Sequence, residues 1–291
     1  MGLQSIKFRE WTSDNKFASL LVQDLSIDIR SETIQALSDY ETRTGLPRAE
    51  INVLDFGCGR GAFVGRLRQR GWRAFGTEID DRFVRAGALV NAMATDAYPL
   101  LTTVQEDGRS LFPDGYFDII VSNQVLEHVA NLDAVVCEMS RQLKPGGIML
   151  HYFPAQFRLV EAHYRLPFAH WLPKNRSRRL AIGMMTLAGL GVRGCKPLTP
   201  KQRTDVIFQY SVEETFYRKP TVIKQAFEVH GLQADFSAIL KRRLEQKIAR
   251  LPSIGATFWQ LLARTLPLIW AYTTFKEAII FCSRKERCGS S

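Results

Sequence analysis

The clearest sign of chemistry in this sequence is an acidic residue, Asp55, followed at every second position by a glycine. The three glycines are Gly57, Gly59 and Gly61. The segment Ile51 to Phe56, in which Val53 and Leu54 are apolar and β-prone, predicts a short buried strand. Glycines directly after a strand permit a sharp turn and allow a ligand to approach the backbone closely. The pattern therefore predicts a strand, a glycine-rich turn and a helix that together hold a nucleotide-like ligand.

The spacing of the glycines separates this turn from two other ligand-binding loops. G-x-G-x-G differs from the dinucleotide pattern G-x-G-x-x-G, and no lysine follows as in a P-loop. With Asp55 two residues ahead, the turn resembles motif I of the class I S-adenosylmethionine (SAM)-dependent methyltransferases. The alternative is a glycine-rich turn without a ligand. The resemblance implies SAM as the cofactor and contacts to it from Asp55, Gly57, Cys58, Gly59 and Gly61.

Further polar residues follow later strands at positions that match the same family. Glu78 lies about twenty residues beyond the glycines, at the end of a predicted strand, Trp72 to Thr77. An acidic residue there can accept hydrogen bonds from both ribose hydroxyls. By the resemblance, Glu78 contacts the ribose and Asp107 faces the adenine. Ser122 and Asn123 end the fourth predicted strand and are expected near the reacting centre.

The elements that must position these residues are those of an open α/β sheet. Phe117 to Ser122 has the continuous apolar character of a central parallel strand. The resemblance covers roughly residues 50–153, about a third of the chain, and implies a Rossmann-like sheet of seven mostly parallel strands. We expect an N-terminal helical cap over residues 1–49 and a SAM-binding core over 50–154. Residues 155–291 would add a substrate-side insertion, helices and the completing strands.

Methyl transfer to a hydroxyl group calls for a base that works near neutral pH, which histidine can supply. His128 lies in Leu126 to Val129, a segment that resembles one in many small-molecule O-methyltransferases. His163, Glu161 and His170 lie in the substrate-side insertion and are further candidates. The alternatives are a histidine that only orders the loop, or catalysis by proximity without a base.

Composition restricts the class of protein. The five cysteines include no C-x-x-C pair, which argues against zinc and against a disulfide framework, so no metal site is predicted. Such cysteine usage suits a reducing cytoplasm. Charged residues interrupt the N-terminal region, so a signal peptide is not expected there. No run reaches the length of about 18 apolar residues that a spanning helix needs.

Positive charge is concentrated in the second half of the chain. Residues 1–150 carry a net charge of −4 and residues 151–291 carry +14, which together give the +10 of the chain. An anionic partner would explain this, as would a solvated basic surface. The basic residues from Lys174 to Arg179 precede the apolar run Leu180 to Val192, which suggests peripheral contact with an anionic membrane. Further along, Ser211-x-x-Glu214 has the form of a capping box and predicts a helix start.

These patterns predict a cytoplasmic SAM-dependent methyltransferase that acts on a small-molecule, glycan or lipid-linked acceptor, with oxygen as the favoured atom. The insertion around residues 161–173 resembles that of bacterial methyltransferases of surface glycan and lipid pathways. A nucleic-acid methyltransferase is a second hypothesis, but Ser122 to Val125 lacks the Asn/Asp-Pro-Pro-aromatic motif of amino-methylating enzymes. A third is a non-catalytic, membrane-docking scaffold, which the intact cofactor motif disfavours.

Overall fold

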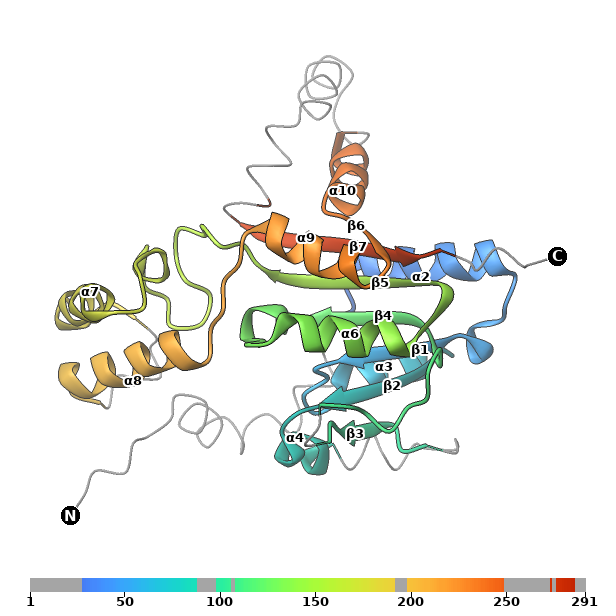
Figure 1. Cartoon of the computed structure of the whole chain (residues 1–291), viewed down its shortest axis with the longest axis horizontal. Coiled ribbons are helices and arrows are strands. Elements are labelled where there is room, and N and C mark those ends of the chain that lie inside the picture. Colours follow the sequence, from blue (N-terminus) through green and yellow to red (C-terminus); the bar gives the residue numbers. More distant parts are fainter. Residues whose placement is uncertain are drawn as a thin grey trace.

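One sheet of seven strands forms the centre of the molecule (Figure 1). The computed structural model describes residues 28–87, 98–105, 108–191, 198–248, 273 and 276–285. The strands are β1 (Asn52–Phe56), β2 (Arg73–Glu78), β3 (Leu101–Thr103), β4 (Phe117–Asn123), β5 (Leu143–Pro154), β6 (Leu232–Asp235) and β7 (Glu277–Arg284). Their order in the sheet is β3-β2-β1-β4-β5-β7-β6. Only β7 runs antiparallel to its neighbours, β5 and β6, so the predicted Rossmann-like fold with a mostly parallel sheet is confirmed.

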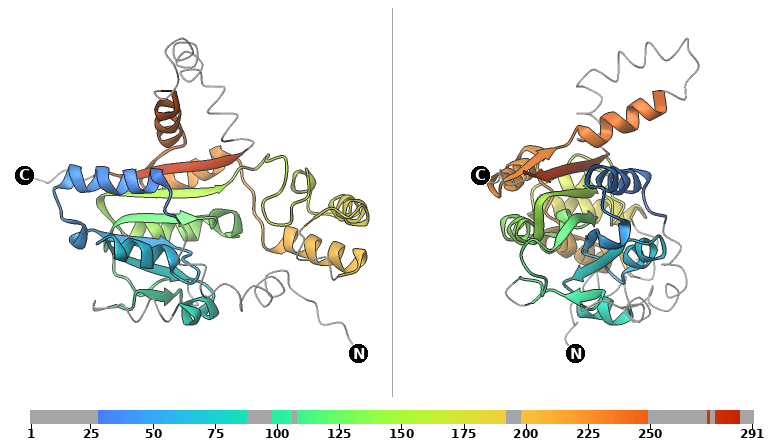
Figure 2. Two further views of the ribbon diagram at one scale, coloured as in Figure 1. Left: turned by 180° about the vertical axis from the view of Figure 1, so that it is seen from behind. Right: turned by 90° about the vertical axis from the view of Figure 1, so that its right-hand side faces the viewer.

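Helices cover both faces of this sheet (Figures 1 and 2). One face carries α6 (Leu132–Gln142) and α9 (Pro220–Val229), and the other carries α2 (Ser31–Thr44) and α3 (Ala62–Gln69). Strands covered on both sides bury most of their side chains, and β1 is buried from Asn52 to Asp55 and β4 from Phe117 to Ser122. The remaining elements of the core are η2 (Arg48–Glu50), α4 (Asp81–Ala86), η3 (Leu126–His128) and α10 (Ala238–Ile248).

Beyond the carboxyl ends of the parallel strands lies a smaller helical unit (Figure 1). It contains η4 (Ala169–Trp171), α7 (Arg176–Leu187) and α8 (Pro200–Glu213). Its own hydrophobic cluster includes Tyr164, Leu166, Ile182, Ile207 and Tyr210, separate from the core beside the sheet. The insertion therefore packs as a helical pair next to the edge at which parallel sheets bind ligands.

The start of α8 differs from the prediction. The helix begins at Thr199, whose side chain accepts from the backbone N–H of Gln202 while the Gln202 side chain accepts from Thr199. Ser211 instead lies in the last turn of α8 and is fully buried. The pattern at Ser211 was misleading because a capping box needs a free helix start, and the chain is already helical there.

The basic run from Lys174 to Arg179, which extends into the first turn of α7, is not a uniform charged surface. Arg178 is only 5% exposed and donates hydrogen bonds to the backbone carbonyls of His170, Leu172 and Ser211. This arginine joins α7 to α8, so the expectation that it faces a membrane is wrong. Leu180, by contrast, is 66% exposed. Among the described residues, no helix combines the length and apolar character needed to cross a bilayer.

Candidate active site

The glycine-rich turn connects the end of β1 to α3 through three residues in the left-handed region. Gly57, Gly59 and Gly61 have φ angles of 76°, 53° and 78°. A Cβ atom on Gly57 would lie 2.4 Å from Val125, and one on Gly61 would lie 2.6 Å from Leu101. A Cβ on Gly59 would have no neighbour within 4 Å. Two of the glycines are thus required by packing, and the third leaves its backbone open on the side where a ligand can approach.

Two carboxylates flank this turn. Oε2 of Glu78 accepts the backbone N–H of Gly59 at 2.9 Å, and its Oε1 accepts that of Ile79 at 2.8 Å. Asp55, at the end of β1, is 6% exposed. Burial, and then the charge of Glu78, raise the pKa of Asp55 to about 7. The site therefore offers negative charge to a positively charged ligand, which would in turn favour the ionised form of Asp55.

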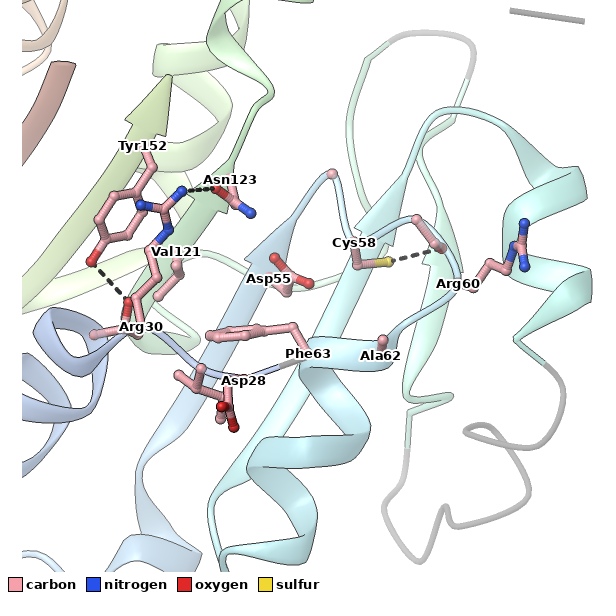
Figure 3. A pocket seen from close by; sticks show the side chains of 14 residues that line it. Asp28, Arg30, Asp55, Cys58, Arg60, Ala62, Phe63, Val121, Asn123 and Tyr152 are labelled. Carbon is pink, nitrogen blue, oxygen red and sulfur yellow. Dashed lines mark hydrogen bonds between the residues drawn. The ribbon is translucent and has the colours of Figure 1, made fainter. Parts of the chain in front are cut away.

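A cavity of about 470 Å³ opens beside the turn (Figure 3). Its wall opposite the glycines comes from the segment that leads into α2, within the region in which the N-terminal helical cap was expected. Arg30 lies over the ring of Tyr152 at 4.6 Å and donates to Oδ1 of Asn123 at 3.5 Å. The hydroxyl groups of Thr33 and Tyr152 are 2.9 Å apart. The lining consists of Asp28, Ile29, Arg30, Thr33, Asp55, Gly57, Cys58, Gly59, Arg60, Ala62, Phe63, Val121, Asn123 and Tyr152.

At the end of β4, the side chains of neighbouring residues lie on opposite faces of the sheet. Val121 and Asn123 line the cavity, whereas the Ser122 hydroxyl is fully buried and bonded to Nδ1 of His151 at 2.7 Å. Successive side chains of a strand alternate between faces, so the side chain of Ser122 faces away from the cavity that Asn123 lines. Asp107, the expected adenine contact, lies outside the described residues.

Cys58 lies in the turn with its thiol directed toward β2. A Cβ atom on Gly76 would lie 2.6 Å from Sγ of Cys58, so the sulfur fills the space that this glycine leaves. Burial raises the pKa of the thiol well above its ordinary value, and the charges of Asp55 and Glu78 raise it further. The thiol therefore stays protonated and packs the turn.

Three of the four candidate catalytic residues meet beyond the end of β4. Nε2 of His128 lies 3.2 Å from Nε2 of His163, and Nδ1 of His163 donates to Oε1 of Glu161 at 2.9 Å. Burial alone raises the pKa of Glu161, but the hydrogen bond and charge of His163 and the hydrogen bond from Tyr217 hold it below its ordinary value. Glu161 is therefore an ionised carboxylate that orients His163, the arrangement that makes an imidazole an effective base.

Two members of this cluster were not predicted from the sequence. Glu127, which precedes His128 in η3, places Oε1 3.9 Å from Nε2 of both histidines. Tyr217, from the segment after α8, donates its hydroxyl to Glu161. Glu127 could have been predicted as a member of the cluster, because it is adjacent in sequence to the candidate base His128. No sequence pattern links Tyr217 to Glu161.

His170, the fourth candidate, lies at the back of the cluster. Its ring is 5.1 Å from the ring of Tyr217, and the residue is 7% exposed. Burial lowers the pKa of His170 to about 4 despite the opposing charge of Glu161. It is therefore neutral at physiological pH and a weak base.

The cavity fits SAM in size and in charge. Its volume lies within the range of about 300–1,000 Å³ that is usual for small-molecule sites. SAM carries a sulfonium and an ammonium group against one carboxylate, and Asp55 and Glu78 complement that net positive charge. The open backbone at Gly59 permits the close approach that the family requires.

Comparison with known proteins indicates the same chemistry. Residues 54–151 match a family described as a methyltransferase domain. A ubiquinone biosynthesis O-methyltransferase of Agrobacterium fabrum is 30% identical over 143 residues, 44% of this chain and 52% of that protein. A demethylmenaquinone methyltransferase of Tropheryma whipplei is 30% identical over 123 residues, 42% of this chain and 50% of that protein. The chain thus spans about half the length of these curated relatives.

A solved structure gives a more distant similarity. The phosphoethanolamine N-methyltransferase 2 of Haemonchus contortus, in complex with S-adenosyl-L-methionine, is 14% identical with a TM-score of 0.46. The similarity covers 87% of this chain and 53% of that protein.

Proposed function

We propose that this chain, whose residues 54–151 belong to the class I SAM-dependent methyltransferases, methylates a hydroxyl group of a small or lipid-linked acceptor. The observation that supports this best is the position of the cluster of His128, His163 and Glu161. His128 lies in η3, the short helix after β4, and Asn123 at the end of β4 lines the cavity beside the glycine-rich turn. A cofactor site and a set of proton acceptors are thus joined by one short segment.

Each part of the cavity has a separate task in this proposal. The bound SAM supplies an electrophilic methyl group. Gly59 and Glu78 hold the amino acid and ribose portions, and Asp55 balances the positive charge. Arg30, Thr33 and Tyr152 close the opposite wall and exclude water from the reacting centre.

The acceptor proton would leave through the histidine cluster. His163 is oriented by ionised Glu161, so its Nε2 is the basic nitrogen that faces away from the carboxylate. His128 is held by a hydrogen bond from its Nδ1 to the backbone carbonyl of Glu214 at 2.7 Å. The proton released when the acceptor oxygen attacks the methyl group would pass to this pair. Residues 155–291 would supply the acceptor side of the site.

The relatives suggest a class of acceptor. One curated relative described above is named for O-methylation in ubiquinone biosynthesis and the other for demethylmenaquinone, so a quinone-type ring on a lipid tail is the acceptor class that we favour. A hydroxyl group attached to such a ring is more acidic than an alcohol, which suits a histidine base. A surface-glycan intermediate is the alternative within the same reaction type.

Peripheral membrane contact is a further part of this proposal, because a lipid-linked acceptor has to be collected from a bilayer. Leu180, Met184 and Leu187 are 66%, 59% and 75% exposed and lie at helical spacing on α7 (Figure 1). Arg176 and Arg179 are exposed on the same helix. This apolar and basic surface belongs to the unit that flanks the acceptor side, so α7 would rest on the cytoplasmic face of the membrane.

Incubation with methyl-labelled SAM and cell extract fractions tests the proposal. We expect label in the lipid or small-molecule fraction, and none with Gly59→Val protein. Label in the nucleic-acid fraction would support the second hypothesis instead. A folded wild-type protein that neither binds SAM nor transfers label would support a scaffold.

A further inference from the structure

Three potential metal ligands converge on one point beyond the end of β4. Nε2 of His128 and Nε2 of His163 are 3.2 Å apart, and Oε1 of Glu127 lies 3.9 Å from each of them. All the ligand atoms of this group lie within 4.8 Å of one another. The equal distances from the carboxylate oxygen to both nitrogens indicate a common centre, and not a bond from Glu127 to one histidine.

The outer hydrogen bonds of both histidines leave Nε2 as the atom that faces the centre. Nδ1 of His128 can only donate to the backbone carbonyl of Glu214, at 2.7 Å. Nδ1 of His163 likewise faces the carboxylate of Glu161, at 2.9 Å. The two Nε2 atoms therefore face each other across the centre, where a shared cation would lie between them. A carbonyl or carboxylate behind each ring is also the usual outer partner of a metal-bound histidine.

We propose that Glu127, His128 and His163 bind a divalent transition-metal ion, with Zn²⁺ as the best match. Two ligand nitrogens on a tetrahedral zinc ion, with bonds of about 2.0–2.1 Å, are about 3.3 Å apart, which agrees with the separation seen here. Two histidines and one glutamate form a ligand set of catalytic zinc sites, in which a water or substrate oxygen takes the fourth position. The side chains of His128 and His163 are 14% and 21% exposed, so the centre is reachable from outside.

The ligand geometry that supports metal binding is independent of the proposed methyl transfer. The role that we assign to the metal ion rests on the proposed function. A metal ion bound to the acceptor oxygen would lower the pKa of that hydroxyl group, so its proton would be lost to solvent before methyl transfer. The two histidines would then act as ligands and not as the proton acceptor. Glu161 and Tyr217 would be positioning residues that fix the orientation of His163.

Metal uptake by the tag-free, full-length protein tests this directly, without SAM or acceptor. After chelation and dialysis, we expect wild-type protein to bind about one equivalent of Zn²⁺, with release of protons if the histidine pair was charged. Co²⁺ in its place should give the visible absorption of a tetrahedral site. His163→Asn and Glu127→Gln should abolish the Co²⁺ spectrum, and Glu161→Gln should weaken Zn²⁺ binding by about 10–100-fold.

His230 provides a matched control, because it pairs with Asp133 at 2.8 Å outside the cluster. His230→Asn should bind metal like the wild type. Absence of metal uptake by folded wild-type protein would overturn the proposal and leave a shared proton between the histidines. Equal uptake by wild type, His163→Asn and Glu127→Gln would also overturn it. A methyl transfer assay on stripped and reloaded enzyme then separates the two proposals: uptake without transfer would contradict only the proposed function.

Discussion

The backbone N–H of Gly59 donates a 2.9 Å hydrogen bond to Oε2 of Glu78. This bond ties the open point of the glycine-rich turn to the end of the neighbouring strand, so the two cofactor contacts expected there form one unit. A change in either residue should therefore affect SAM binding before it affects the rest of the core.

Substitution of Gly59 by valine should block the cofactor while the protein remains folded. The φ of 53° imposes a cost of about 1–2 kcal/mol on any residue with a Cβ, but no atom lies within 4 Å of that position. Calorimetric titration should show a loss of SAM affinity of more than about tenfold, the equivalent of 1.4 kcal/mol. Gly45→Val is the control, since Gly45 also has a positive φ and open surroundings but ends α2 away from the cavity. Equal SAM affinity in both variants would contradict this assignment.

Glu78→Ala should weaken SAM binding through the loss of charge-assisted hydrogen bonds to the ribose. Such bonds contribute about 1.5–3 kcal/mol, so the dissociation constant should rise roughly ten- to a hundredfold. Glu78→Gln keeps one acceptor oxygen and should lose less. A dissociation constant that is unchanged in Glu78→Ala would mean that this carboxylate serves only the Gly59 and Ile79 backbone groups.

Asp55 should make both stability and cofactor affinity depend on pH. Its pKa is about 7 in the folded protein and about 4 in an unfolded chain, so the unfolded state loses its proton first. The free energy of unfolding should therefore fall as the pH rises from about 4 to about 7, and then level off. SAM affinity should change in the opposite direction, because the cationic cofactor favours ionised Asp55.

Asp55→Asn is the matched variant for this pH dependence. Its melting temperature should vary less between pH 4 and 7 than that of the wild type, and its SAM affinity should lack the rise toward pH 7. Identical pH profiles in the two proteins would show that Asp55 does not titrate in this range.

Vesicle flotation tests the membrane surface on α7. We expect binding to anionic vesicles at low salt that weakens at high salt, since each basic residue near such a surface contributes on the order of 1 kcal/mol. Leu180→Glu with Leu187→Glu should abolish flotation. Val229→Glu is the control, because Val229 is 69% exposed on α9 and lies outside the proposed surface. Failure of the wild type to float would argue for an acceptor taken from solution.

Arg178 should prove structural. Arg178→Met leaves the carbonyls of His170 and Ser211 without their donor in a buried position, which should cost at least about 2 kcal/mol in urea unfolding. The neighbouring Arg179 is half exposed and pairs with Asp205 at the surface. Arg179→Met should therefore cost under about 1 kcal/mol. Similar midpoints for the two variants would contradict the role assigned to Arg178.

The sequence by itself determined the cofactor half of the protein. Motif I, the acidic residue at the end of the second strand and the apolar run of the fourth are local patterns, and each is confined to one strand and the turn after it. The predicted bounds of the first, second and fourth strands agree with β1, β2 and β4 within one residue for the same reason. Periodicity is a local property, so it is readable without knowledge of the fold.

The tertiary structure decided the acceptor half. Arg30 meets Tyr152, and Glu127 and His128 meet His163, across long separations in sequence that no spacing rule links. It also decided which face of the sheet a side chain lies on, and Ser122 lies on the face away from the cavity. In the same way it decided which charged groups are buried, and Arg178 is one of them. Contacts of this kind depend on how distant elements pack together. The interactions that stabilise them join several segments, so no single segment of the sequence predicts them.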